Sequence, residues 1–299
     1  MDNLTHGLLG YAVYAARDNR RWTKKERWGY ATAAIVGGEI PDIEGFTTFM
    51  GQAVYLTWHR GFTHSLLFAP VMALLAVGIV WLFNRSIRLR TAYPLALCGV
   101  FLHIFTDWFN TWGTGLLEPL HSDRYSLGFL FIVDIVILSA FLLFFLLRRK
   151  YPGPRVFRTL WVFLFLYMAS QAGQAWVLHH QLIGDYDRVT VSADAIPTRF
   201  RMVAHKGDEF HFYKGSVFTP LKKTGEAKNQ HHPVVKEALK DKEARALVRF
   251  LPSYGTAIEE TAEAYRVTIY DPRFRKVQPS LLSTVVEVSK KNVGKGEER

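Results

Sequence analysis

The stretch HRGFTHSLLFAPVMALLAVGIVWLF, residues 59–83, places two histidines and an arginine directly before an uninterrupted apolar run. Residues 65–83 carry no charged side chain. A helix of about 20 apolar residues is long enough to cross the hydrocarbon core of a bilayer. The stretch therefore predicts a membrane helix with His59, Arg60 and His64 at its mouth.

Other apolar runs extend this pattern over the first part of the chain. Three have the length of a span, and they lie at 92–110, 128–147 and 157–178. Two shorter runs, at 4–16 and 28–40, would each cover only about 20 Å as helices. We expect these two to form a helical hairpin that enters the bilayer partway. Residues 1–178 are thus predicted to form an all-α polytopic membrane helix bundle.

The net charge of +11 is concentrated in three short segments between the apolar runs, at 17–27, 84–90 and 148–158. Lys and Arg in short loops mark the cytoplasmic side of a membrane protein. This distribution indicates membrane topology and argues against binding to nucleic acid. Alternation of the runs then places the N-terminus and the loops 41–64 and 111–127 outside, together with everything after residue 178.

Residues 179–299 are polar and mixed in charge, and they predict a small α+β extracytoplasmic domain. Their β-branched and aromatic residues alternate as in strands in five segments, RVTVSA, FRMVAH, EFHFYKGSVF, YRVTIYD and STVVEVS. The segment HPVVKEALKDKEARALVRFL has helical spacing. We therefore expect two domains, a membrane-embedded one at 1–178 and a soluble one at 179–299.

Ionisable side chains lie within and beside the apolar runs, where they are costly and commonly functional. His103 and Asp107 are four residues apart, so their side chains share one helix face. Under the predicted topology, a whole set of such residues falls toward the outer side. The set contains His6, Asp42, Glu44, His59, His64, His103, Asp107, His121 and Asp134.

Imidazoles together with carboxylates predict a site for a divalent metal ion. The only cysteine, Cys98, excludes both an internal disulfide and a cysteine-based zinc site. We expect zinc, as one to three ions, with manganese or iron as alternatives. Arg60 stays protonated and is not expected to be a ligand, but it suits an anionic group of a substrate.

The motifs that carry these residues resemble the bacterial inner-membrane, metal-dependent hydrolases of the YdjM type. The matching segments are DNLTHGLLG, GGEIPDIEGF, HRGFTHSLL, HIFTDWFNTWGTGLLEPL and SDRYSLGFLFIVD, in this order within residues 1–145. The resemblance implies a membrane-embedded metal site, hydrolase activity and location in the bacterial cytoplasmic (inner) membrane. Where this chain has Asp42-Ile-Glu44, the family often has Asp-x-Asp. The implied metal positions are His6, Asp42, His59, His64, His103, Asp107 and Asp134.

We therefore expect metal-activated water to hydrolyse a lipid or another membrane-associated ester. A looser resemblance to zinc-dependent phospholipase C and related nucleases favours a phosphoester. Glu44 or Asp134 would act as general base, and Arg60 or Arg124 would neutralise negative charge on the substrate. Two other classes fit the same residues, namely a divalent-metal or proton-coupled transporter and a non-enzymatic scaffold or regulatory protein. The sequence predicts the lipid bilayer as a partner and leaves protein partners open.

Overall fold

The structure, a computed structural model, describes residues 1–274 and 282–290. These residues form two compact units, each assembled from separate segments of the chain. The first unit contains Met1–Glu44, Arg60–Val177 and Ser192–Phe200. The second contains Gly45–His59, Leu178–Val191 and the described residues from Arg201 onward. The predicted division of the chain at residue 178 stays a prediction.

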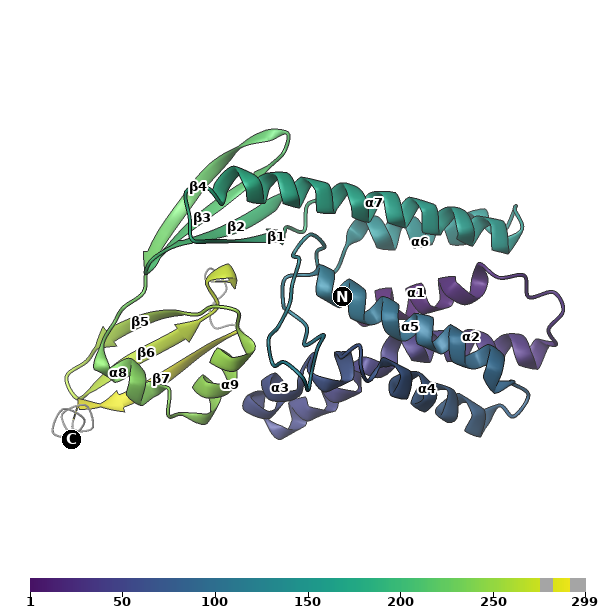
Figure 1. The fold of residues 1–299 in the computed structure, drawn as a ribbon, viewed down its shortest axis with the longest axis horizontal. Coiled ribbons are helices and arrows are strands. Elements are labelled where there is room, and N and C mark those ends of the chain that lie inside the picture. The colour runs from purple at the N-terminus through teal and green to yellow at the C-terminus, as the bar shows by residue number, and fades with distance from the viewer. Residues whose placement is uncertain (275–281, 291–299) are drawn as a thin grey trace. The chain divides into compact units, whose positions relative to one another are not determined.

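The part of the chain before the sheets is helical, as predicted (Figure 1). Its elements are α1 (Asn3–Ala15), α2 (Lys24–Glu39), η1 (Ile40–Met50), α3 (Gln52–Trp58), η2 (Phe62–His64), α4 (Ala69–Phe83), α5 (Leu89–Phe109), α6 (Ile135–Leu147) and α7 (Gly153–Leu182).

Fewer of these helices can span a membrane than the sequence suggested. Among the described residues, α5 and α7 are long and apolar enough. A third span results if the bent pair Gln52–His64 and Ala69–Phe83 counts as one broken span. The predicted span at 128–147 is instead a loop followed by the 13-residue helix α6. The helix is short because Asp134 caps its N-terminus, so its first turn begins after that residue.

Glycines allow α2 to pack closely against both α1 and α5. A Cβ atom on Gly10 of α1 would lie 2.3 Å from the carbonyl oxygen of Ala34, inside α2. A Cβ atom on Gly37 of α2 would lie 2.3 Å from the carbonyl oxygen of Ala96 in α5. Small residues at helix crossings let backbones approach each other in this way. The two crossings bring the start of α1, the end of α2 and the second half of α5 together.

Helices α6 and α7 lie side by side (Figure 1). Phe144 of α6 and Phe163 of α7 are in aromatic contact, with ring centroids 6.4 Å apart. Tyr167 of α7 donates a hydrogen bond of 2.8 Å to Asp134 at the start of α6.

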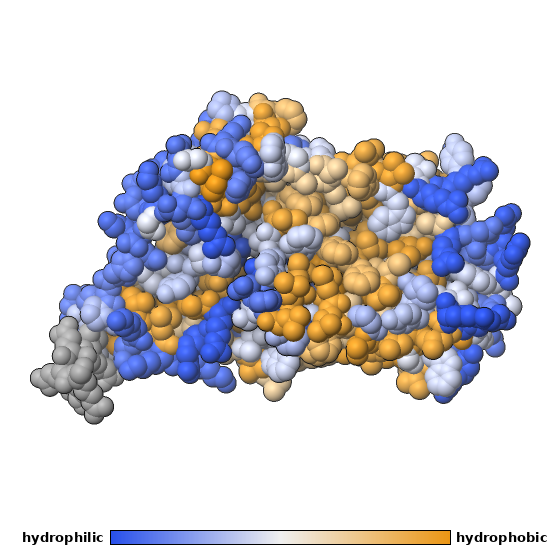
Figure 2. Space-filling view, in the orientation of Figure 1, coloured by the Kyte–Doolittle hydropathy of each residue, from blue (hydrophilic) through white to orange (hydrophobic). Residues whose placement is uncertain are grey.

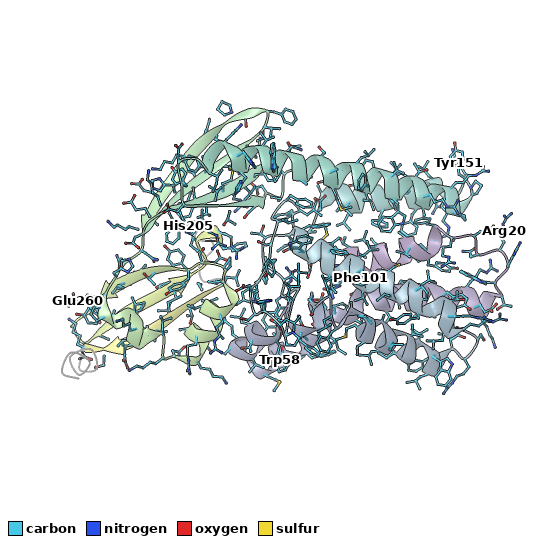
Figure 3. All side chains as sticks on the ribbon, viewed as in Figure 1. Arg20, Trp58, Phe101, Tyr151, His205 and Glu260 are labelled. Carbon is cyan, nitrogen blue, oxygen red and sulfur yellow. The ribbon has the colours of Figure 1, made fainter. Side chains whose placement is uncertain are left out.

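The basic loops gather at one end of the first unit. Asn84 donates a hydrogen bond of 2.9 Å to the Lys25 carbonyl, and Arg158 donates one of 3.0 Å to the Ala16 carbonyl. Figure 3 shows Arg20 and Tyr151 at this same end. Figure 2 shows apolar side chains over the helices and hydrophilic ones at that end. The three basic segments therefore meet as the topology requires, while the side of the membrane they face stays a prediction.

The second unit contains most of two small sheets with short helices. The sheets have the orders β1-β2-β3-β4 and β5-β6-β7. Their strands are β1 (Arg188–Ala193), β2 (Phe200–Lys206), β3 (Glu209–Ser216), β4 (Thr219–Lys228), β5 (Gly255–Glu260), β6 (Ala264–Tyr270) and β7 (Ser283–Ser289). The helices are α8 (Pro233–Ala238), α9 (Lys242–Phe250) and the 3-10 turn η3 (Pro272–Phe274).

All five predicted strand segments are strands in the structure, but two further strands, β4 and β5, had no prediction. The single helix expected from HPVVKEALKDKEARALVRFL is divided into α8 and α9. Asp241 causes the division, since its side chain accepts hydrogen bonds from the backbone amides of Glu243 and Ala244 and caps α9. Helix α9 packs against α3 within the second unit.

Candidate metal centre

Four of the sequence-predicted ligands converge at the end of the first unit remote from the basic loops. Asp42 follows α2, His64 ends η2, and His103 and Asp107 lie on successive turns of α5. Each offers one ligand atom, and the four atoms lie within 4.8 Å of one another. The predicted pairing of His103 with Asp107 on one face of a helix brings both into this cluster.

The separations between these atoms match those of a small metal site. The two Nε2 atoms of His64 and His103 are 3.0 Å apart. Oδ1 of Asp42 lies 3.5 Å from Nε2 of His64 and 3.6 Å from Nε2 of His103. Oδ2 of Asp107 lies 3.4 Å from Nε2 of His64 and 3.8 Å from Nε2 of His103. Tetrahedral zinc with bonds of about 2.0–2.1 Å needs ligand atoms about 3.3–3.4 Å apart.

Both histidines are held by their other ring nitrogen. Nδ1 of His103 lies 2.6 Å from the carbonyl oxygen of Gly38. A carbonyl only accepts, so Nδ1 carries the proton and Nε2 is left with a lone pair. Nδ1 of His64 lies 3.3 Å from Oε1 of Glu44 and 3.1 Å from Oγ1 of Thr63. Such partners fix the tautomer and orientation of metal-binding histidines.

The carboxylates differ in exposure. The side chain of Asp42 is 19% exposed, whereas those of His64, His103 and Asp107 are at most 1% exposed. Burial opposes ionisation of Asp42, but the imidazoles of His103 and His64 beside it hold its pKa well below the usual range. Asp42 is therefore the member of the cluster with the greatest exposure to solvent.

His6 borders the cluster from α1. Its ring stacks on that of His103 with centroids 3.7 Å apart, and its Nε2 lies 3.3 Å from Oδ1 of Asp107. This buried Nε2 has no hydrogen-bond partner among the described residues. A buried polar atom without a partner is costly, and a bound ion would satisfy it. The donor set and this atom together fit a divalent metal ion.

Arg60 contacts the cluster rather than open space. Its Nε and Nη2 lie 2.9 and 3.0 Å from the two oxygens of Asp107, and Nη1 donates a hydrogen bond of 2.8 Å to Asn110. The residue is 4% exposed and has a left-handed backbone with φ of 55°. Strained backbone of this kind is often found at functional sites. The predicted contact of Arg60 with a substrate anion is not supported by this arrangement and stays a prediction.

Asn110 is a residue of the site that the sequence analysis missed. Its amide donates a hydrogen bond of 3.2 Å to Oδ1 of Asp107, and it is fully buried. Its position three residues after Asp107, on the same helix face, was the available signal.

Glu44 lies behind His64. It is 7% exposed, and it accepts hydrogen bonds from the backbone amide of Arg60 and the hydroxyl of Thr63. These contacts connect Glu44 to the backbone that carries His64. Its predicted role as general base is untested by this geometry.

Both carboxylate oxygens of Asp134 accept hydrogen bonds at the start of α6, away from the cluster. One carboxylate oxygen accepts hydrogen bonds from the backbone amides of Val136 and Ile137, and the other accepts one from Tyr167. The residue acts as an N-cap of α6 and is not among the converging ligand atoms. Its predicted roles as ligand and as base therefore stay predictions without geometric support.

His59 belongs to the second unit, where it is the C-cap residue directly after α3. Its ring stacks on Tyr55 with centroids 4.5 Å apart, and it also contacts the ring of Phe250 in α9. Its predicted role as a metal ligand stays a prediction.

The loop at 111–127 lies against the segment that carries His64. The backbone amide of Gly115 donates to the Arg60 carbonyl, and that of Leu66 donates to the Leu116 carbonyl. Arg124 stands in this loop. Burial lowers the pKa of its guanidinium, and the carboxylates of Glu118 and Glu44 oppose that shift. Arg124 is thus a cation held near the carboxylates beside the cluster.

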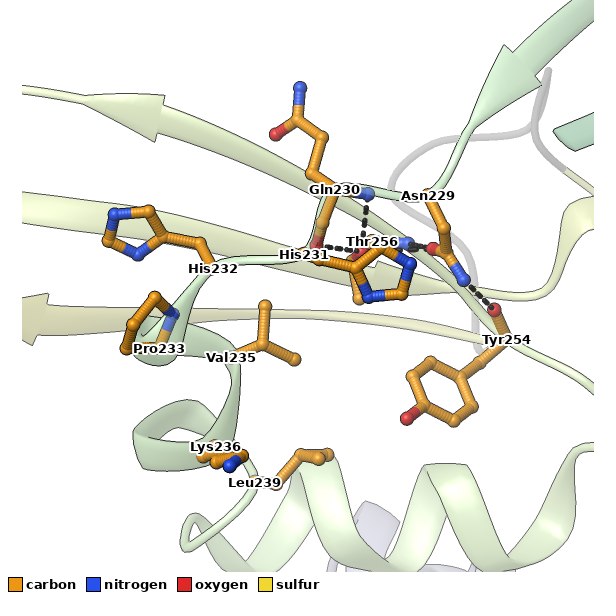
Figure 4. A pocket seen from close by; sticks show the side chains of 10 residues that line it. All are labelled: Asn229, Gln230, His231, His232, Pro233, Val235, Lys236, Leu239, Tyr254 and Thr256. Atoms are coloured by element: carbon orange, nitrogen blue, oxygen red, sulfur yellow. Dashed lines mark hydrogen bonds between the residues drawn. The ribbon is translucent and has the colours of Figure 1, made fainter. Parts of the chain in front are cut away.

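The second unit has a separate cavity of about 410 Å³ around the start of α8 (Figure 4). His232 caps α8 there, since its Nδ1 accepts from the backbone amide of Val234. His231 is exposed and forms an ion pair of 2.7 Å with Asp208. The described residues of this cavity contain no group of three potential metal ligands.

The fold and the cluster define a helical membrane protein with a buried histidine–carboxylate site. The sequence profile of the family described as YdjM inner membrane protein matches residues 1–177. The chain therefore belongs to the YdjM inner membrane protein family, as the sequence motifs suggested.

A curated relative is the uncharacterized protein YfhP of Bacillus subtilis (strain 168). It is 24% identical over 258 residues, which cover 81% of this chain and 76% of the relative. This coverage exceeds residues 1–177, so the similarity includes part of the region after the helices. No solved structure matches the chain significantly.

Proposed function

We propose that this protein is a metal-dependent hydrolase that acts on a lipid or another membrane-associated ester, with phosphoesters as the preferred class. The observation that carries the proposal is the convergence of Asp42, His64, His103 and Asp107, whose ligand atoms lie within 4.8 Å of one another. Two imidazoles with two carboxylates and no thiolate are typical of catalytic rather than purely structural zinc sites.

The same donors accept several first-row ions. Zinc is the ion we prefer in this proposal, while manganese and iron also use mixed nitrogen and oxygen ligands. His6 offers a further nitrogen beside Asp107, at 3.3 Å from its Oδ1. With His6 the site offers more donors than one tetrahedral ion needs, so we propose that it holds one to three ions.

A divalent ion in this cluster would supply a Lewis acid and lower the pKa of a bound water to about 7. The chain's own contribution is orientation. Gly38 holds the ring of His103, and Glu44 holds that of His64, so that both Nε2 atoms face the cluster. The greater exposure of Asp42 leaves an approach for a substrate on its side.

Arg60 has a positioning role in this proposal. Its guanidinium fixes both oxygens of Asp107, with Asn110 as a further partner. Arg124, in the loop that lies against the site, is the proposed cation for the substrate's negative charge. We assign no general base to Asp134, since both of its oxygens are engaged at the start of α6.

The setting favours a water-insoluble substrate. The cluster belongs to the helical unit that contains α5, a helix long and apolar enough to span a membrane. Large apolar side chains such as Leu74, Leu82 and Leu142 are exposed on its helices, as expected for lipid contact. A lipid could therefore reach a site at one end of these helices without leaving the bilayer.

The test uses full-length protein in detergent, purified without a histidine tag. The protein is stripped with a chelator, reloaded with zinc, manganese or iron, and assayed on phospholipids and soluble phosphoesters. We expect hydrolysis that His64→Ala and Asp42→Asn abolish and that His121→Ala, an exposed loop histidine, leaves unchanged. Activity retained in the first two variants would refute the proposal. Metal uptake into proteoliposomes without any hydrolysis would favour the transporter instead.

A further inference from the structure

A second cavity of the second unit lies between α3 and α9 and has a volume of about 320 Å³. It combines an apolar floor with a basic rim. The floor is formed by Ala53, Val54 and Ala246, and the rim by Trp58, Lys242, Arg245 and Arg249. We call it the α3–α9 groove.

The basic rim is a row of cations on one face of α9. Lys242, Arg245 and Arg249 follow a helical spacing of three and four residues, and all three are exposed. The opposite face of α9 is buried through Leu247 and Phe250. Within the described residues, no carboxylate forms an ion pair with any of the three cations. Like charges at this spacing repel each other, so an anion bound among them would be stabilised.

Large apolar side chains are exposed in the segment that leads into α3 and at its end. The exposed fractions are 70% for Phe46, 90% for Phe49, 70% for Met50 and 53% for Trp58. Of these four residues, Trp58 is labelled in Figure 3. Water would make such exposure costly, whereas a lipid surface would remove it. Basic residues beside exposed aromatic and apolar ones are the pattern of segments that lie in the membrane interface.

We propose that the α3–α9 groove binds the headgroup of an anionic phospholipid. The lipid phosphate would lie among Lys242, Arg245 and Arg249, and Trp58 would lie at the boundary with the acyl chains, a depth that tryptophan favours. The groove is near the lower limit of ligand pockets in volume, so it suits a headgroup whose acyl chains remain in the bilayer. A soluble anion would leave Phe49 and Met50 in water. The inference is independent of the proposed hydrolysis.

The test is native mass spectrometry of the full-length protein in detergent. Phosphatidylglycerol and phosphatidylcholine with identical acyl chains are titrated separately. We expect tighter binding of phosphatidylglycerol by the wild type. The triple variant Lys242→Gln, Arg245→Gln, Arg249→Gln should bind it on the order of a hundredfold more weakly, since each cation near a lipid surface contributes about fivefold.

The matched control removes three positive charges from exposed positions of β4, in Lys222→Gln, Lys223→Gln, Lys228→Gln. It should bind phosphatidylglycerol like the wild type. Arg245→Gln alone should lose about fivefold, which keeps the test valid if the triple variant unfolds. Equal affinity of the wild type for both lipids, or an equal loss in the β4 control, would overturn the proposal. So would complete displacement of the lipid by excess inorganic phosphate.

Discussion

At the scale of single residues, the contact of Glu44 with His64 determines the role that we assign to Glu44. Its carboxylate lies 3.3 Å from Nδ1 of His64, on the far side of the ring from the other ligands. Residues that orient metal-binding histidines typically change metal affinity by about 10–100-fold when they are replaced. We therefore predict that Glu44→Gln weakens metal affinity by this factor but keeps the site, as measured by competition with a chromophoric chelator. Asp123→Asn, an exposed control, should have no effect, and an unchanged affinity in Glu44→Gln would contradict the assignment.

Asp134 should matter for stability and not for metal content. Loss of a side-chain N-cap typically costs about 0.5–2 kcal/mol. Asp134→Ala removes both the cap of α6 and the acceptor of Tyr167, so we predict a loss of this size in the free energy of unfolding with bound metal retained. Tyr167→Phe, which removes only one of these contacts, should cost less. If the Asp134→Ala protein is folded but contains no metal, the result would contradict this prediction and support Asp134 as a metal ligand.

The sequence predicted the residues whose position follows from local spacing. His103 and Asp107 were placed correctly on one face because a helix fixes that relation. Asp134 resembled an isolated acid inside a span because 128–147 reads as one apolar run. The pairing of Arg60 with Asp107 could not be predicted, since it depends on a left-handed backbone at Arg60 and on a contact 47 positions along the chain.

At the scale of elements, the α2–α5 crossing positions the site. A methyl group on Gly37 would lie 2.3 Å from a backbone oxygen, which cannot move away as a flexible side chain can. We predict that Gly37→Ala lowers stability by about 1–3 kcal/mol and also weakens metal binding, because Asp42 follows α2 directly. A methyl group on Gly78 of α4 would have no neighbouring atom within 4 Å, so Gly78→Ala should be neutral or slightly stabilising. Thermal unfolding of both variants in one detergent makes the comparison, and equal effects would contradict it.

Strand β4 was missed although its pairing partner, β3, directly precedes it in the chain. Strand β4 has the sequence TPLKKTGEAK, without the apolar alternation that predicts a strand. It forms through antiparallel pairing with β3, and its side chains are mostly exposed. Helix α4 and the strand β1, by contrast, have continuous or alternating apolar residues, and they appear where the sequence placed them.

At the scale of the whole molecule, the grouping of the basic loops leads to a prediction of topology. In a Cys98→Ser background, Arg20→Cys and Tyr151→Cys should react with a membrane-impermeant thiol reagent only from the cytoplasm. His121→Cys and Lys222→Cys should react from the outside, because the positive-inside rule sets the orientation. Labelling in intact cells and in inverted vesicles separates the two sides. Outside labelling of position 20 would reverse the topology.

The place of one early segment in the second unit could not be predicted from the sequence. The segment Gly45–His59 was expected only as part of an outer loop, but it belongs to the second unit, where α3 packs against α9. No local sequence pattern predicts the contact between α3 and α9, which are separated by nearly two hundred positions. The helical character of the first part and the α+β character of the second did follow from hydrophobic periodicity.

The central claim is that Asp42, His64, His103 and Asp107 hold a metal ion. Its most direct test is inductively coupled plasma mass spectrometry on untagged protein, purified gently in detergent, with His103→Ala and the exposed control His121→Ala alongside. We predict one to three equivalents of zinc, manganese or iron in the wild type and in His121→Ala, and a loss of metal in His103→Ala. A metal-free wild type, or a His103→Ala protein with undiminished metal, would contradict it.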